Sequence, residues 1–143
     1  MERIELIAQS ETRDKLYLAR SAQTIGRAND NLRGVQRFMQ VEYSTLVHAP
    51  AENVFRIYED VANWHTWDPD TKRASIDGPF LVGTHGSLAP SKGNTVPMLL
   101  TKVAIGSCFT VESKIPLFRM VFEHELSPQG NAVKVTHRVT FAG

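Results

Sequence analysis

Two histidines on neighbouring predicted strands have the side chains best suited to proton transfer. In residues 117–126, LFRMVFEHEL, His124 alternates with charged residues, and in residues 132–141, AVKVTHRVTF, His137 does the same. Side chains along a strand point to alternate faces, so both histidines share a face with apolar residues. Imidazole gains and loses a proton near neutral pH. The pattern predicts an acid–base pair inside an apolar site, and two structural histidines bonded to backbone or water are the alternative.

The distance between these histidines depends on the register of the two strands. If Leu126 pairs near Val133, then His124 lies opposite Val135 and His137 lies opposite Phe122. The two rings would then be diagonal neighbours, with about 7–8 Å between their backbones. We predict no metal site there, because spacing alone places no third ligand.

The stretch NWHTWDPD, residues 63–70, contains both tryptophans of the chain. Trp64 and Trp67 are three residues apart, which places them on one side of a helical turn. Each can bury about 150–250 Å² of surface. Asp68 before Pro69 indicates the end of a helix, and His65 points away from the tryptophans. The stretch is therefore interpreted as the hinge and lip of a pocket rather than as an active site.

Other kinds of chemistry have little support in the sequence. The glycines of residues 83–88, GTHGSL, lie on a predicted strand with no helix after it, so they do not predict a phosphate site. No Gly-x-Ser-x-Gly motif of a hydrolase occurs. Cys108 is the single cysteine, and no neighbour in sequence would stabilise its thiolate. We predict no cofactor.

Composition narrows the location and the partners. The chain has 143 residues and a net charge of +1, without a block of lysine or arginine, which argues against a nucleic-acid partner. No uninterrupted apolar run is long enough to span a membrane or to act as a secretory signal. The sequence predicts a cytoplasmic protein without stable membrane insertion.

The chain divides into two parts of different periodicity. Residues 1–40 are predicted to form an N-terminal helical extension, with an apolar stripe of Leu18, Ala22, Ile25, Leu32, Val35 and Met39. Residues 41–47 alternate as a strand, and a helix beginning near Pro50 follows, with Val54, Ile57, Tyr58 and Val61 on its apolar side. Six strand-like runs come next: 72–77, 82–90, 95–105, 108–115, 117–126 and 132–141. This order predicts an α+β domain with helices on one side of a curved antiparallel sheet.

Residues 41–143 resemble a known family. The stretches VEYSTLVHAPAENVFRIYEDVANWHTWDP, IDGPFLVGTHGSLAP and VFEHELSPQGNAVKVTHRVTFAG are similar to the polyketide cyclase/dehydrase and lipid-transport group of the START and birch-pollen-allergen-like (SRPBCC) superfamily. The resemblance implies a helix-grip fold, in which a seven-stranded antiparallel sheet wraps around a helix. It also implies an apolar cavity between sheet and helix, which binds a hydrophobic or aromatic ligand.

The expected cavity wall combines the parity of the strands with this resemblance. The candidate ligand-binding residues are Trp64, Trp67, Met98, Leu100, Phe109, Val111, Met120, Phe122 and Val135, with an ordinary core as the alternative. Binding or transport of a small hydrophobic molecule is the leading hypothesis. An aromatase/cyclase or dehydratase using His124 or His137 is the second, although no arginine faces inward by parity. A protein-interaction module is the third.

The sequence departs from the family after the last predicted strand. Family members normally follow that strand with a long helix, and this sequence ends at Gly143. Val133, Val135, Val139 and Phe141 would then be open to solvent, which calls for a cover. Residues 10–39 could fold back as a substitute helix, or a second copy could cover the face in a homodimer. If Met39 is instead the true start, the helix prediction for 10–39 is accidental.

Overall fold

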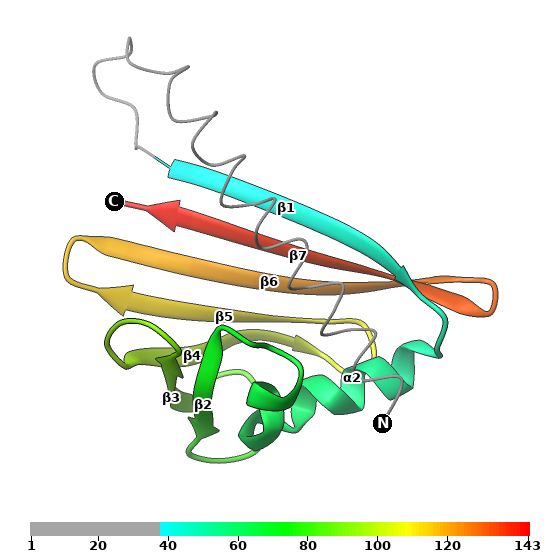
Figure 1. Ribbon diagram of the computed structural model, residues 1–143, viewed down its shortest axis with the longest axis horizontal. Helices are drawn as coiled ribbons and strands as arrows, with labels where there is room; N and C mark the ends of the chain where they lie inside the picture. The colour runs from blue at the N-terminus through cyan, green and yellow to red at the C-terminus, as the bar shows by residue number, and fades with distance from the viewer. Residues whose placement is uncertain (1–37) are drawn as a thin grey trace, which may run out of the picture.

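The computed structural model describes residues 38–143 as a curled antiparallel sheet with a short helix against it (Figure 1). The elements in chain order are β1 Phe38–Val47, α2 Ala51–Glu59, the 3-10 helix η1 Val61–Thr66, β2 Thr71–Ile76, β3 His85–Pro90, β4 Val96–Ala104, β5 Cys108–Ile115, β6 Phe118–Gln129 and β7 Ala132–Ala142. The strand order is β1-β7-β6-β5-β4-β3-β2, and every pair is antiparallel. The predicted helix-grip fold is confirmed.

The first strand begins earlier than the periodicity suggested. Phe38 pairs with Ala142 and Met39 pairs with Phe141, and the pairing continues to Val47. The assignment of Met39 to a helical stripe was therefore wrong, because ten residues of β1 have a full-length partner in β7. The rest of the predicted extension of residues 1–40, including the helix over residues 10–37, lies outside the described residues.

The helix α2 is short and is held by its buried side. Pro50 occupies the N-cap position with φ −62°, as expected for a proline that opens a helix. Val54, Phe55 and Tyr58 are buried. A helix of this length is marginal by itself, so its stability comes from packing rather than from propensity.

The β6–β7 hairpin corrects the predicted register. Leu126 pairs with Val135 rather than Val133, and His124 lies directly opposite His137. The predicted strand ended at Leu126, but β6 continues to Gln129 and the turn has only two residues. Proline has no backbone N–H, and it is tolerated at Pro128 because β6 extends past the start of β5, where no partner strand needs a donor. The predicted register is shifted by two residues. Because side chains alternate between the two faces with a period of two, each side chain keeps its predicted face.

The core lies between α2, η1 and the concave face of the sheet. Val133 and Val135, expected to be open to solvent, are 0% and 5% exposed and belong to the same cluster as Val54 and Phe55. That expectation was wrong for these two valines, because they belong to the buried cluster that α2 completes. Val139, farther along β7, is half-buried, as is Phe141.

The opposite face of the sheet contains ion pairs. Arg138 Nε donates to Glu42 at 2.7 Å, and Arg138 Nη1 lies 3.4 Å from Glu123 and 3.5 Å from Glu125. The hydrogen bond to Glu42 raises the pKa of Arg138; burial opposes this rise, and the charges of the three carboxylates add to it. One guanidinium thus links strands β1, β6 and β7.

Replacing Arg138 by methionine is expected to lower the free energy of unfolding by about 1 kcal/mol at low salt. A single exposed ion pair contributes little, but this substitution removes the cation that three carboxylates share. Urea unfolding at low and high NaCl measures this effect. The difference from the parent should shrink as salt screens the charges. An equal loss at both salt concentrations would assign the effect to packing of the arginine stem.

The β5–β6 turn contains an unusual residue. Ile115 pairs with Phe118, so Pro116 and Leu117 form the two-residue turn. Leu117 has φ 76° and is the only non-glycine residue with positive φ among the described residues. The left-handed conformation costs an L-residue about 1–2 kcal/mol, and glycine normally occupies such positions. Leu117 is nevertheless 85% exposed, so packing does not offset this cost.

Candidate functional site

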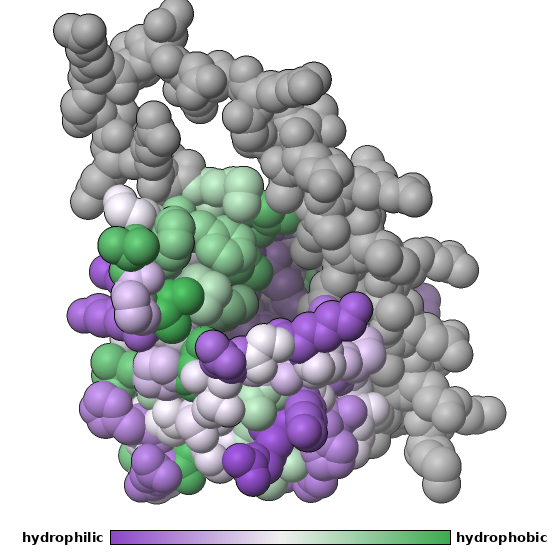
Figure 2. Space-filling view, turned by 60° about the vertical axis from the view of Figure 1, so that its left-hand side comes forward, coloured by the Kyte–Doolittle hydropathy of each residue, from purple (hydrophilic) through white to green (hydrophobic). Residues whose placement is uncertain are grey.

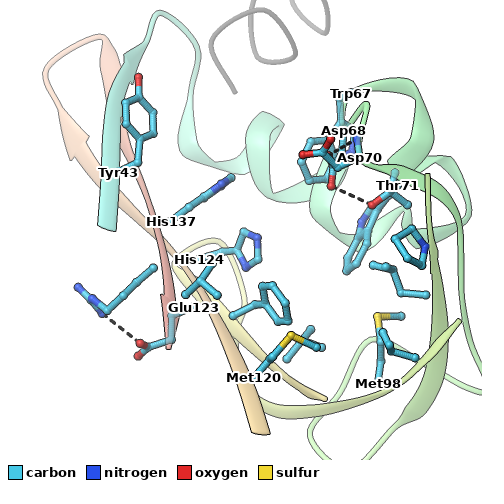
Figure 3. Close-up of a pocket in the computed structure, with 18 residues that line it drawn as sticks. Tyr43, Trp67, Asp68, Asp70, Thr71, Met98, Met120, Glu123, His124 and His137 are labelled. Carbon is cyan, nitrogen blue, oxygen red and sulfur yellow. Dashed lines mark hydrogen bonds and ion pairs between the residues drawn. The ribbon is translucent and has the colours of Figure 1, made fainter. Parts of the chain in front are cut away.

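A cavity of about 430 Å³ lies between the concave face of the sheet and the segment from η1 to β2. This volume is within the range of about 300–1,000 Å³ found for small-molecule sites. Figure 3 shows the cavity with side chains from the sheet and from the Trp-rich segment around it. Its lining comprises Tyr43, Trp64, Trp67, Asp68, Asp70, Thr71, Leu88, Pro90, Val96, Met98, Val111, Met120, Phe122, Glu123, His124, His137, Arg138 and Val139.

Most of the predicted wall residues meet at this cavity. Those lining it are Trp64, Trp67, Met98, Val111, Met120 and Phe122. Leu100, Phe109 and Val135 do not line it and are 2%, 0% and 5% exposed, in the core cluster. Strand parity placed all of them on the concave face, but it could not separate the cavity wall from the core. The part that each plays in binding remains a prediction.

The two tryptophans lie at the end of η1. Trp64 is inside η1 and Trp67 directly follows it; they are 6% and 4% exposed, with ring centroids 6.1 Å apart. Trp64 Nε1 donates to the carbonyl of Tyr58 at 2.9 Å, which ties η1 to α2. His65 is exposed, in keeping with the prediction that it points away from the tryptophans. The Trp-rich stretch is therefore part of the cavity wall, and its histidine is not.

The predicted histidine pair lies at one side of the cavity. His124 on β6 and His137 on β7 face each other across the ladder, with ring centroids 4.4 Å apart and planes inclined by 65°. Both line the cavity. They are closer than the diagonal arrangement expected from sequence, because the hairpin register places them in one cross-strand pair. Two imidazoles at this distance can contact the same ligand.

Two buried aromatic residues fix the orientation of these imidazoles. The ring of Phe109 stacks on His124 with centroids 4.2 Å apart and planes within 5°. The Tyr58 hydroxyl lies 2.8 Å from Nε2 of His137, and its ring meets His124 edge-on at 5.4 Å. Either Tyr58 donates to His137 or His137 donates to Tyr58, depending on the tautomer. Sequence reasoning placed Tyr58 on the apolar side of its helix but missed this hydroxyl contact.

A second polar group lies across the cavity from the histidines (Figure 3). Asp68 accepts a hydrogen bond from the Thr71 hydroxyl at 2.8 Å and another from the backbone N–H of Asp70 at 3.0 Å. All three residues line the cavity. The sequence interpretation read Asp68 only as a helix stop. The run Asp-Pro-Asp-Thr directly after a buried tryptophan was the available signal.

Two charged lining residues direct their side chains elsewhere. Glu123 points to the outer face in Figure 3, where it pairs with Arg138.

The part of the chain that the structure describes has no group of three His, Cys, Asp or Glu residues able to hold a metal. No helix within residues 38–143 is long and apolar enough to span a membrane.

The sequence of this domain matches a family model. The model describes polyketide cyclases, dehydrases and lipid-transport proteins, and it matches residues 39–143. The chain belongs to this family. The match begins one residue after the start of β1, so it covers nearly all of the described sheet. A comparison with curated protein sequences gives no match.

Solved structures of the same fold have distant sequences. The ZhuI aromatase/cyclase from Streptomyces sp. R1128 superposes with a TM-score of 0.64 at 17% identity, covering 75% of this chain and 70% of that one. Norcoclaurine synthase from Thalictrum flavum, in complex with dopamine and hydroxybenzaldehyde, gives 0.61 at 13%, covering 81% and 79%. The protein Ara h 8.0201 gives 0.58 at 13%, covering 73% and 77%. Identities this low establish the fold alone.

Proposed function

We propose that the protein binds a small hydrophobic or aromatic ligand in the cavity between its sheet and its helical segment. The observation that carries this proposal is the cavity of about 430 Å³, whose wall is mostly aromatic and aliphatic. Sites of this kind bury most of a small ligand and use a few polar groups to orient it. The family and the neighbours of the same fold support this proposal. The cytoplasmic location and the homodimer remain predictions.

The distribution of polar groups constrains the ligand. His124 and His137 lie on one side of the cavity, and Asp68, Asp70 and Thr71 lie on the other. The rest of the wall is largely apolar and includes the tryptophans, Met98, Met120 and Phe122. A ligand that satisfies this wall has an apolar or aromatic body with hydrogen-bonding groups at both ends. The soft methionine side chains can adapt to the outline of that body.

Tryptophan fluorescence gives a direct test of binding. Both tryptophans of the chain line the cavity, so an aromatic molecule that enters must change their emission. We expect saturable quenching on titration with 2-naphthol, and retention of a small hydrophobe by the purified protein in native mass spectrometry. A protein that shows neither saturable quenching nor a retained molecule would contradict the proposal.

Replacing Val139 by phenylalanine is expected to weaken 2-naphthol binding about tenfold or more. Val139 lines the cavity, and a larger ring there occupies ligand space, at a cost of about 1–3 kcal/mol for overpacking. Fluorescence titration measures the change. The control is Val121→Phe, the same substitution on the adjacent strand with opposite parity, where the side chain faces outward. Equal affinities of the two variants would place the ligand elsewhere.

A second candidate function has its own supporting observation. The His124–His137 pair, with Tyr58 2.8 Å from His137, could carry protons in a cyclisation or dehydration of a poly-β-keto substrate. In a cyclisation, one neutral imidazole removes the proton between two carbonyl groups, and the carbon attacks a second carbonyl. The other imidazole, as imidazolium, protonates the oxygen formed there. In the dehydration that follows, the neutral imidazole removes a proton from the carbon next to the hydroxyl-bearing carbon, and the protonated imidazole gives its proton to the leaving hydroxyl. The hydroxyl departs as water while a carbon–carbon double bond forms.

A further inference from the structure

The tip of the β5–β6 hairpin exposes two large apolar side chains. Leu117 is 85% exposed and Phe118 is 54% exposed. The backbone of Leu117 adopts the left-handed conformation that favours glycine. The tip therefore combines an exposed apolar side chain with backbone strain. Neither feature benefits the folded domain by itself.

The tip continues an apolar track that begins in the cavity. Phe118, Met120 and Phe122 alternate along the same face of β6, and the latter two line the cavity. The cavity lies toward this end of the sheet, because Thr71 at the start of β2 and Pro90 at the end of β3 also line it. Figure 2, viewed toward this end, shows apolar residues beside a hollow.

Cations stand directly behind the tip on the outer face. Lys114 pairs with Arg119 across β5 and β6, and both are exposed. Like charges placed directly opposite each other are unfavourable. A contact of 3.8 Å between Arg119 and Glu112 offsets the repulsion only in part, since half of the Arg119 side chain remains in solvent.

We propose that the β5–β6 hairpin tip docks on an anionic lipid surface. Leu117 and Phe118 enter the boundary between headgroups and acyl chains, and Lys114 and Arg119 meet the lipid phosphates. Apolar side chains with cations one step behind them are the combination that binds such an interface. The lipid surface provides an apolar medium for the Leu117 side chain and anionic phosphates for Lys114 and Arg119. This places the open end of the cavity against the membrane without inserting an element across it.

The test is co-flotation of the full chain with vesicles of phosphatidylcholine alone and of phosphatidylcholine with phosphatidylserine. We expect flotation with the mixed vesicles, weakening as NaCl rises. Leu117→Gly should lower the affinity about tenfold while keeping the melting temperature at or above that of the parent, because it removes both the apolar side chain and the strain. Lys114→Gln and Arg119→Gln should each lower it about fivefold.

The control is Ile105→Ser in the β4–β5 turn, at the other end of the sheet, where an isoleucine is 68% exposed. This variant should float like the parent. Equal losses in Ile105→Ser and Leu117→Gly, or no flotation of the parent with mixed vesicles, would overturn the proposal. A dimer that Leu117→Gly separates, without any vesicle binding, would assign the tip to a second copy instead. Ligand binding is measured separately by tryptophan fluorescence, so failure of docking leaves that result independent.

Discussion

For the second candidate function, glutamine in place of both His124 and His137 is expected to lower the rate of cyclisation or dehydration of a poly-β-keto substrate by about 10²–10⁴-fold. Glutamine keeps a polar side chain of similar reach but cannot exchange a proton near neutral pH. The two imidazoles line the cavity and can exchange protons near neutral pH, and their ring centroids are 4.4 Å apart. Single-turnover assays with a synthetic poly-β-keto thioester measure the rate.

Three further measurements keep this result interpretable. The melting temperature and the 2-naphthol affinity of the double variant should stay close to those of the parent, which separates chemistry from folding and binding. Tyr58→Phe removes only the hydroxyl that lies 2.8 Å from His137 and should produce a smaller loss of rate than the histidine variants. Unchanged turnover in the double variant would exclude the acid–base role. The binding proposal would then stand alone.

Alanine in place of Phe109 is expected to lower the free energy of unfolding by about 3–5 kcal/mol. Phe109 is 0% exposed, and its ring contacts those of Tyr58, Phe80 and His124. Its removal leaves a void among aromatic rings that are held at fixed angles, and such a site cannot collapse easily. Urea unfolding monitored by tryptophan emission measures the loss, since Trp64 lies 6.0 Å from the Phe109 ring.

The matched variant for Phe109 is Phe118→Ala on the neighbouring strand. Phe118 is 54% exposed, so its truncation should cost less than about 1 kcal/mol. A loss below about 1 kcal/mol for Phe109→Ala as well would show that the aromatic cluster rearranges to fill the void. The stacking of Phe109 on His124 would then not be a fixed feature of the site.

The sequence predicted the face of the sheet on which a side chain lies more accurately than it predicted the cross-strand partner of that residue. Strand parity placed His124 and His137 on the concave face, and a two-residue error in register left that assignment unchanged. The same error separated the two rings, because the predicted strand was ended at Leu126, before the turn-like residues 127–131. A proline in a strand segment that has a partner on only one side and a proline in a turn look alike in one sequence. Only the pairing of β6 with its neighbours distinguishes them.

The polar parts of the site were harder to predict than its apolar wall. Tyr58 fits an apolar helical stripe as well as any leucine, and the position of its hydroxyl depends on how α2 crosses the sheet. The role of Asp68 was inferred from Pro69, which follows it. A proline predicts the backbone conformation of the preceding residue, but not the direction of its carboxylate. Phe109 and Val111 have the same parity on β5, yet only Val111 reaches the cavity. Phe109 packs against Tyr58, Trp64 and Phe80, and strand periodicity does not show where along a strand such a cover ends.

The pairing of β1 with β7 also affects how the domain folds. The first and last strands of the described sheet are neighbours, and Phe38 pairs with Ala142. Closing contacts between residues this far apart in sequence costs loop entropy before any pairing compensates for it, which slows folding. His137 belongs to β7, which lies between β6 and β1 in the sheet. One wall of the ligand site can therefore be completed only after β7 has been synthesised. During translation β6 is made before β7, so until β7 follows one edge of β6 has no partner strand, and an unpaired strand edge beside the apolar track favours aggregation of the nascent chain.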